Sequence, residues 1–331
     1  MPPRVSIIVP VFNAEPYLAC LLTSLFSQTE SSIEIIAVDD GSTDRSAELL
    51  TQAARTDSRL RVFLQANLGL AQTRNIALSH ATGEWIAFAD SDDWLDANAL
   101  KLRIDRAVEQ DLDVLVGNAF HFCESPGDQP RTPLLKHQSW NEVITGEEWL
   151  IRGSTREFPH QVWLQLIRRS CLLQWHVKFI EGIVHEDIPW TLSVALAARR
   201  VGFLPAPLYG YRLSAGSVTA DSSARAIQLR IQSYLKILPL MAAAAAQAKS
   251  QQLRRTLAHQ AHDEGTKCLA LLRKRLHDPA RRAESARLIL QSELFPITVR
   301  GATRLREVWR ALRGFACCQF AVAYARIFVH A

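Results

Sequence analysis

The stretch Phe88-Ala89-Asp90-Ser91-Asp92-Asp93-Trp94 places three carboxylates within four residues. It continues the apolar run Trp85-Ile86-Ala87-Phe88-Ala89, which is typical of a buried strand in a parallel sheet. Carboxylates crowded at a strand end repel one another and are costly to desolvate, so we expect a cation beside them. Mg2+ and Mn2+ prefer such oxygen ligands and take substrate phosphates as further ligands. The alternative is a solvated acidic turn in which Asp92 or Asp93 caps a following helix.

The residues before this stretch alternate between strand and helix patterns. Strands are expected at 5–10, 33–38, 60–64 and 85–89, and helices at 15–28, from 42 to about 55, and 70–81. We expect Ser42 or Thr43 to cap the second helix. Strands joined by helical crossovers form a parallel, doubly wound α/β sheet, which binds ligands at the C-terminal ends of its strands. Polar clusters at 10–13, 39–40 and 90–93 should therefore meet at one edge.

The rest of the chain divides into a mixed segment and a helical one. Another strand is expected at 114–116, a loop at 125–130, and helical or mixed elements at 140–149 and 162–175. Helices are expected at 224–248, 251–276, 279–291 and from about 304. We therefore predict a catalytic α/β domain over residues 1–220 and a helical domain over residues 221–331.

Composition and charge narrow the class of protein. The chain has 331 residues, an ordinary hydrophobic fraction, six scattered cysteines without metal-site spacing, and no stretch that reads as a signal peptide or membrane span. Residues 1–220 carry a net charge of −7 and residues 221–331 carry +12. No nucleic-acid-binding motif accompanies the basic part, so we expect no nucleic-acid partner. A reducing, cytoplasmic setting is expected.

Several polar groups outside the Asp90 turn could bind a ligand or take part in catalysis, and each of them could instead have a purely structural role. Asp39 and Asp40 could accept hydrogen bonds from a base or sugar, or form a helix-capping turn. Arg74 near a helix start suits an anion or a structural pair with an aspartate. His185-Glu186-Asp187 could supply a general base or begin a helix. The segment from Arg212 to Ser217 could close on a diphosphate or serve as a linker.

Four of these stretches resemble, in order, the motifs of the family 2 inverting glycosyltransferases, which have the GT-A fold. They are Val5-Ser6-Ile7-Ile8-Val9-Pro10-Val11-Phe12-Asn13, Val38-Asp39-Asp40-Gly41-Ser42-Thr43-Asp44, Asn67-Leu68-Gly69 with Ala71-Gln72-Thr73-Arg74-Asn75, and Thr82 to Asp93 with its DXD motif. The resemblance weakens from 100 to 180, returns at Glu186-Asp187 and at 212–217, and does not cover the last hundred residues.

The resemblance implies a role for each matching residue. Asp39 would hydrogen-bond the base, most often uracil, with Pro10 and Asn67 nearby, and Arg74 would hold the nucleotide or phosphate. Asp90 would face the ribose or donor sugar and, with Asp92, contribute to a Mn2+ or Mg2+ site at the diphosphate. Asp187 would deprotonate the acceptor hydroxyl, supported by Glu186 or His185. Arg212 and Ser217 would belong to a loop closing over the diphosphate.

The resemblance therefore implies a metal-dependent hexosyltransferase that moves a sugar from a nucleotide-sugar donor, with UDP-sugars favoured, to a saccharide or lipid-linked acceptor. One in-line displacement inverts the anomeric centre, and growing phosphate charge is stabilised by metal and arginines. Cell-surface polysaccharide or glycoconjugate synthesis is the expected setting. The alternative is a catalytically silent nucleotide-sugar-binding or scaffold protein of the same fold.

The basic helices at 221–331 have two interpretations. They carry Arg273-Lys274-Arg275, Arg281-Arg282 and a series of arginines from Arg300 to Arg313, followed by an apolar segment at 315–329. Basic amphipathic helices bind anionic lipid surfaces, so peripheral attachment to the inner face of the cell membrane is favoured. The alternative is a helical packing or homo-oligomerisation domain.

Overall fold

An eight-stranded sheet organises the first of two units in the computed structural model, which describes residues 2–127, 130–153, 158–213 and 221–328. The strand order is β3-β2-β1-β4-β7-β6-β8-β5. The first unit comprises Met1–Glu181 and Trp190–Ser214, and the second comprises Gly182–Pro189 and Ala215–Ala331. The segment 182–189 thus clusters with the C-terminal helices although the chain on both sides of it belongs to the sheet unit.

The parallel half of the sheet follows the pattern expected from the sequence. It contains β1 (Val5–Val11), β2 (Ile33–Asp39), β3 (Leu60–Leu64) and β4 (Trp85–Phe88), all parallel. Every residue of β1, β2 and β4 is buried, because helices cover both faces of a doubly wound sheet. Pro10 lies in β1 opposite Val38, beyond the point where β4 ends its pairing at Ile8. A proline is tolerated there because β1 has a ladder partner on one side only.

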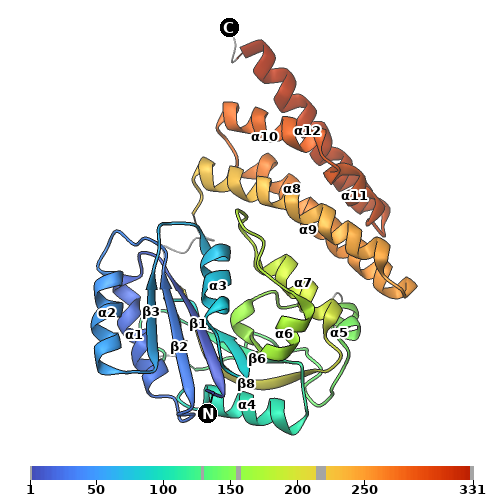
Figure 1. The fold of residues 1–331 in the computed structure, drawn as a ribbon. Helices are drawn as coiled ribbons and strands as arrows, with labels where there is room; N and C mark the ends of the chain where they lie inside the picture. Colours follow the sequence, from blue (N-terminus) through green and yellow to red (C-terminus); the bar gives the residue numbers. More distant parts are fainter. Residues whose placement is uncertain (1, 128–129, 154–157, 214–220, 329–331) are drawn as a thin grey trace. The chain divides into compact units, whose positions relative to one another are not determined.

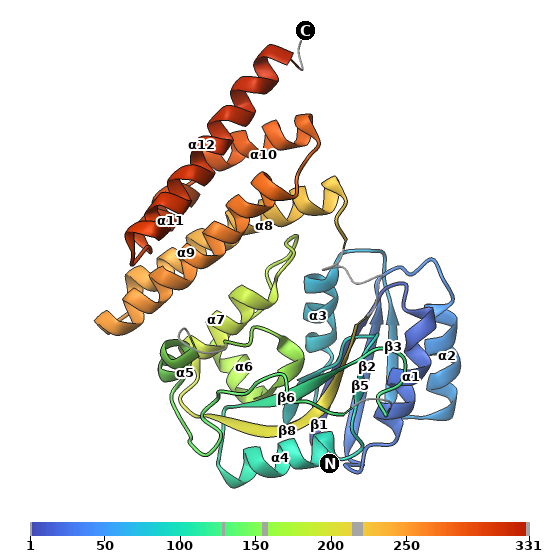
Figure 2. The same cartoon turned by 180° about the vertical axis from the view of Figure 1, so that it is seen from behind.

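Helices of ordinary length connect these strands. They are α1 (Glu15–Phe26), α2 (Ser46–Thr56) and α3 (Leu70–Ser79), and α4 (Ala99–Glu109) follows β4 and packs on β6 and β8. Figures 1 and 2 show α1 and α2 on one side of the parallel strands and α3 on the other. This is the arrangement that the alternating pattern predicts.

The other half of the sheet is mixed. It contains β7 (Gln165–Arg168), antiparallel to β4 and β6, then β6 (Val114–Phe122) parallel to β8 (Val201–Arg212), with β5 (Trp94–Leu95) antiparallel to β8. The prediction of a strand at 114–116 was correct but too short. Arg212, which we expected to begin a closing segment or a linker, is the last residue of β8 instead. The unit also contains α5 (Gly146–Gly153), η1 (Val162–Leu164) and α6 (Arg169–Trp175).

The second unit is helical. Helix α7 (Asp187–Ala197) begins in this unit, and α8 (Ala224–Gln247), α9 (Gln251–Lys274), α10 (Pro279–Gln291), α11 (Leu294–Arg300) and α12 (Leu305–Phe328) follow. Ser223, Ser250 and Asp278 cap α8, α9 and α10 through their side-chain oxygens. In the part of the chain that the structure describes, no helix combines the length and apolarity needed to cross a bilayer.

Candidate active site

The C-terminal ends of β1, β2 and β4 gather the polar clusters predicted from the sequence. Val11, at the end of β1, pairs with Asp39 at the end of β2. Phe88, the last residue of β4, pairs with Ile8 of β1, so the acidic turn follows on the same edge. Since β1 separates β2 from β4, the two acidic ends are about 10 Å apart, from the usual spacing between strands. This spacing suits a ligand of the length of a nucleoside diphosphate.

The neighbouring carboxylates of Asp39 and Asp40 have different surroundings. Asp40 is fully engaged: Oδ1 accepts from the Leu68 backbone N–H at 2.7 Å and from Gln65 Nε2 at 2.8 Å, and Oδ2 accepts from the Gly69 N–H at 2.8 Å. Asp39 Oδ2 accepts from the Ser42 N–H at 3.0 Å. Asp39 Oδ1 is buried and has no hydrogen-bond partner among the described residues, although the residue is only 3% exposed.

An unpaired buried carboxylate oxygen is costly unless a ligand pairs with it. Asp39 Oδ1 is therefore suited to accept a hydrogen bond from a bound donor group, such as the N–H of a nucleobase. Asp40, by contrast, fixes the loop between β3 and α3.

Asn67 lies in that loop and is exposed. Gly41 shapes the approach of the two loops, because it has φ +72° and a Cβ at this position would come within 2.8 Å of the Asn67 backbone nitrogen. A glycine is thus required both by the left-handed conformation and by the close approach. The Asn67 backbone is thus close to the end of β2, where Asp39 lies, and its role at a nucleotide stays a prediction.

The loops after β1 and β2 are also joined. Asn13 Oδ1 accepts from the Thr43 N–H at 2.8 Å, and the Asn13 N–H donates to Ser42 Oγ at 2.9 Å. The prediction that Ser42 or Thr43 caps α2 was wrong. The helix begins at Ser46, whose N–H donates to Asp44 Oδ1 at 2.9 Å, because Ser42 and Thr43 are already used to bind the β1 loop.

Arg74, in α3, reaches the acidic turn after β4. Its Nη2 donates to Asp90 Oδ1 at 2.8 Å, and its guanidinium lies over the Phe179 ring, 5.4 Å from the centroid. Arg74 is buried whereas Asp90 is partly exposed. The pair is thus the Arg–Asp contact that the sequence left open, and it brings the positive charge to the site at which phosphates were expected.

The turn from Asp90 to Asp93 concentrates negative charge. Burial, and next the nearby charge of Asp90, raise the pKa of Asp92 to about 6. Burial and the charges of Asp90 and Asp92 also raise the pKa of Asp93 well above its usual range. A carboxylate that resists ionisation because of its neighbours gains most from a bound cation, so this turn fits a hard divalent ion.

Two carboxylates do not complete a metal site. Among the described residues no group of three or more His, Cys, Asp and Glu side chains is placed to hold a metal. An ion at Asp90 and Asp92 would therefore take its other ligands from water or from a ligand's phosphate oxygens. This is the usual arrangement for Mg2+ in nucleotide-binding sites.

Asp93 does not cap a helix, contrary to our alternative interpretation of the turn. It is fully buried, and β5 follows it rather than a helix. Its Oδ2 accepts from the Tyr209 hydroxyl at 2.6 Å and its Oδ1 from the Arg212 N–H at 2.8 Å. The Tyr209 hydroxyl also accepts from the Asp90 N–H at 3.1 Å. Asp93 and Tyr209 therefore attach the acidic turn to β8.

Arg212, the last residue of β8, is part of the same cluster. Its Nε donates to the Asp92 carbonyl at 2.7 Å, and its Nη1 donates to the carbonyls of Cys123 and Glu124, each at 3.0 Å. The guanidinium lies 4.3 Å from the Phe122 ring centroid. Arg212 thus lies beside the acidic turn, and its role at a diphosphate stays a prediction. Ser217, predicted to act with it, lies outside the described residues.

Glu186 and Asp187 belong to the second unit and are described with it. Asp187 is the first residue of α7, and Glu186 is buried. The segment is held by α8: Ser233 Oγ accepts from the Val184 N–H at 2.8 Å, Lys236 Nζ donates to the Gly182 carbonyl at 3.2 Å, and the His185 ring lies 5.5 Å from the Tyr234 ring.

The helices thus position the segment predicted to carry the general base. His185 has φ 66°, a conformation that is uncommon for a residue with a side chain. Burial in this unit lowers the pKa of His185.

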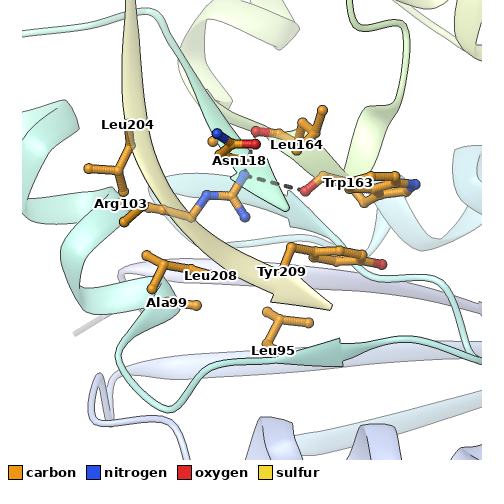
Figure 3. A pocket seen from close by; sticks show the side chains of 11 residues that line it. Leu95, Ala99, Arg103, Asn118, Trp163, Leu164, Leu204, Leu208 and Tyr209 are labelled. Atoms are coloured by element: carbon orange, nitrogen blue, oxygen red, sulfur yellow. Dashed lines mark hydrogen bonds between the residues drawn. The ribbon is translucent and has the colours of Figure 1, made fainter. Parts of the chain in front are cut away.

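A narrow internal space in the sheet unit is distinct from this edge. It is lined by Leu95, Ala99, Arg103, Gly117, Asn118, Trp163, Leu164, Leu204, Ala206, Leu208 and Tyr209 (Figure 3). It has no room for a water molecule. The buried Arg103 donates to the Leu164 carbonyl at 2.7 Å, and burial lowers its pKa to about 10. We interpret this space as an imperfectly packed part of the core.

Sequence reasoning missed the residues that support the site. Tyr209, Ser233 and Tyr234 were not singled out. Their partners are distant in the chain: Tyr209 and Asp93 are 116 positions apart, and Ser233 and Val184 are 49 apart. The only signal was the presence of polar residues within otherwise apolar patterns.

The chain is similar in sequence to known glycosyltransferases. Residues 6–170 match the family model described as Glycosyl transferase family 2. The uncharacterized glycosyltransferase YibD of Escherichia coli (strain K12) is 34% identical over 217 residues, which are 65% of this chain and 63% of that protein. The glycosyltransferase GlyG of Streptococcus pneumoniae serotype 4 is 31% identical over 222 residues, 65% of this chain and 72% of GlyG. This chain therefore spans somewhat under two thirds of YibD.

Solved structures share the fold over nearly the whole chain. Staphylococcus aureus TarS (residues 1–349, with UDP-GlcNAc) has a TM-score of 0.70 and 19% identity, and the match covers 98% of this chain and 91% of that one. The mannosyltransferase PcManGT of Pyrobaculum calidifontis, with GDP-Man and Mn2+, has a TM-score of 0.55 and 16% identity, covering 99% and 88%. At these identities the likeness shows a GT-A fold followed by helices.

Proposed function

The chain belongs to glycosyltransferase family 2, and we propose that it transfers a sugar from a nucleoside diphosphate donor, a UDP-sugar, to an acceptor hydroxyl with inversion. One observation carries this proposal. Asp39 Oδ1 is buried without a hydrogen-bond partner among the described residues, and the carboxylates of Asp90 and Asp92 lie two strands away on the same sheet edge. The first accepts a hydrogen bond from a base, and the second pair lies where the diphosphate is expected.

The base end of the donor is supported by the surroundings of Asp39. A uracil ring offers an N–H donor between two carbonyls, and Asp39 Oδ1 is the matching acceptor. Pro10 and Asn67, at the ends of the adjacent strand and loop, complete the expected nucleoside site. The bound form of TarS, described with UDP-GlcNAc, has a donor of this class, which is why a UDP-sugar is our first choice.

The phosphate end is supported by charge. Asp90 and Asp92 present hard oxygen atoms that fit Mn2+ or Mg2+, and burial together with the charge of Asp90 raises the pKa of Asp92. When bound, the ion would stabilise the negative charge that grows on the leaving diphosphate. Arg74 holds Asp90 in place, and Arg212 holds the main chain at Asp92. Ser217 would contribute to closure over the diphosphate.

Acceptor activation is assigned to Asp187, with Glu186 supporting it. Asp187 is the first residue of α7, where the positive end of the helix dipole favours a negative charge. It can therefore accept the acceptor's proton as the oxygen attacks the anomeric carbon. A single displacement on the face opposite the leaving diphosphate inverts that carbon.

The acceptor that we propose is a saccharide or lipid-linked glycan of cell-surface polysaccharide or glycoconjugate synthesis, and the proposed location is the cytoplasmic side of the membrane. The direct test is release of free UDP from UDP-sugars in the presence of Mn2+, preceded by a thermal-shift screen of nucleotide sugars with and without the ion. Binding without UDP release under any donor and acceptor pair would instead support the silent nucleotide-sugar-binding protein.

A further inference from the structure

Helix α12 carries an exposed apolar stripe that no described residue covers. Its opposite face packs on α9, α10 and α11 through small buried residues, Ala311, Gly314, Cys318, Ala321 and Ala325. The exposed face contains Leu305 (82% exposed), Trp309 (71%), Leu312, Phe320 (69%) and Tyr324. These positions are three, four or eight residues apart, which are whole turns of a helix, and so lie along one side of it. From Leu305 to Tyr324 the stripe is about 30 Å long at the usual helical rise.

Basic side chains border this stripe on one flank. Arg306, Arg310 and Arg313 each follow a stripe residue by one position, so all three project from the same side of the apolar face, and all are exposed. The one acidic residue of α12, Glu307, is engaged at the helix start, where its Oε2 accepts from the N–H groups of Thr303 and Arg304. The flank thus has positive charge without a free carboxylate.

We propose that this face of α12, the Trp309 stripe with its arginine flank, binds an anionic lipid surface. Helices that combine large aromatic side chains with a basic flank lie in the plane of the membrane interface, with the apolar residues among the acyl chains and the arginines at the lipid phosphates. Arginine stems are long enough to follow the apolar surface while the guanidinium reaches the headgroups. The net charge of +12 over residues 221–331 favours the same partner.

A second copy of the chain fits this face less well. Association through two α12 stripes would bring six arginines together, and Glu307 is already used by its own helix. Lipid phosphates supply the missing negative charge. The surface shares no residue with the proposed donor site, so the proposal is independent of which sugar is transferred.

The test is sedimentation of the full-length protein with vesicles of phosphatidylglycerol and phosphatidylcholine, against vesicles of phosphatidylcholine alone, at low and high salt. We expect binding to the anionic vesicles that weakens with salt. Changing Arg306, Arg310 and Arg313 to Glu should reduce the partition coefficient at least about 100-fold, since each arginine near such a surface contributes roughly five-fold. The charge-matched control changes Arg255, Lys274 and Arg275, also exposed, to Glu and should retain most of the binding.

The apolar part is tested separately. Trp309→Ala with Phe320→Ala should weaken binding to anionic vesicles at least 10-fold, whereas Leu229→Ala with Leu240→Ala, at exposed positions of α8, should not. Circular dichroism checks that each variant is folded. The proposal is overturned by equal binding of the two triple variants, by no binding of the wild type to anionic vesicles at low salt, or by light scattering that shows a dimer dissolved by the Trp309 change.

Discussion

The Tyr209 hydroxyl donates a 2.6 Å hydrogen bond to the buried carboxylate of Asp93 and accepts another from the Asp90 N–H. Strand β8 thereby holds the turn that carries Asp90 and Asp92. Because β8 enters the sheet more than a hundred residues after this turn, the site is complete only when the whole first unit has folded. We expect loss of this hydrogen bond to lower the stability of the protein more than it weakens metal binding.

Tyr209→Phe removes this link while keeping the ring stacked on Trp163. It leaves Asp93 Oδ2 buried without a donor, which should cost about 1–3 kcal/mol in the free energy of unfolding. Urea denaturation of Tyr209→Phe, Asp93→Asn and the double variant gives the coupling between the two groups. Additive effects of the two changes would contradict the link.

Asp39 and Asp40 form a matched pair for testing the base site. Asp39→Ala should weaken UDP binding about 10- to 100-fold, the usual loss for a hydrogen bond to a charged group, and should cost less stability than Asp40→Ala because it removes only the bond from the Ser42 N–H. Asp40→Ala removes three hydrogen bonds to the loop at 65–69 and should lower stability by about 2–4 kcal/mol. Calorimetric titration with UDP and denaturation of both variants measure the two effects. If Asp39→Ala bound UDP like the wild type, Asp39 would have no role at the base.

The raised pKa of Asp92 predicts that the stability of the protein depends on pH. Its folded-state pKa, raised to about 6 by burial and by Asp90, lies above the unfolded value, so ionisation at neutral pH opposes folding. Asp92→Asn should therefore raise stability at neutral pH without metal, by roughly 1–3 kcal/mol, and should lose the stabilisation that Mn2+ gives the wild type.

For the wild-type protein, Mn2+-dependent binding of UDP should weaken as the pH falls through about 6, because the proton competes with the ion for Asp92. Thermal unfolding with and without Mn2+ across this range is the measurement. A metal effect that persists unchanged at acidic pH, or in Asp92→Asn, would remove Asp92 from the metal site.

Asp187→Asn tests the general base. Turnover should fall about 100- to 10,000-fold while UDP affinity stays within a factor of about two, because the base acts on the acceptor and not on the donor. Glu186→Gln is the neighbouring control and should have the smaller effect on turnover. Loss of UDP binding and turnover in equal measure in Asp187→Asn would argue against this role.

Ser233 tests whether α8 positions the base. Ser233→Ala removes the acceptor for the Val184 N–H and should reduce kcat roughly 10-fold with KM for the donor unchanged, since small displacements of a catalytic group are costly. Ser285→Ala is the matched control, because Ser285 is equally buried and its Oγ has no partner in the described part of the chain. Equal kinetics of the two variants would count against positioning by Ser233.

The sequence was sufficient to predict the parallel half of the sheet. There, buried strands, helical crossovers and polar strand ends follow one another within about 90 residues, so each pattern is local. The mixed half could not be predicted in the same way. Strand β8 contains Pro205 and Pro207, which normally argue against a strand, and its pairing with β6 shifts register at Asn118 to accommodate them. Asn118 Nδ2 donates to the Pro205 carbonyl at 3.1 Å in this irregular region.

Within the site, we could predict the residues that follow a strand directly in the sequence. We could not predict the residues whose hydrogen-bond partners are distant in the chain. The carboxylates of Asp39, Asp90 and Asp92 were visible as acidic turns after strands. Asp39 and Asp40 have different roles because the loop at 65–69 donates hydrogen bonds to Asp40 and leaves Asp39 Oδ1 without a partner. The spacing of residues in the sequence does not contain that information. The same is true of Asp93, whose partners lie on β8.

The membership of residues 182–189 in the helical unit has a consequence for engineering. The chain leaves the sheet unit, contributes this segment to the helices and returns before it leaves again near residue 215. The C-terminal helices are therefore not an interchangeable module. A chimera that joins residues 1–220 to the helices of another family member would keep the segment but replace Ser233 and Lys236, which hold it. Recombination between such enzymes should succeed only when the segment and its supporting helix are exchanged together.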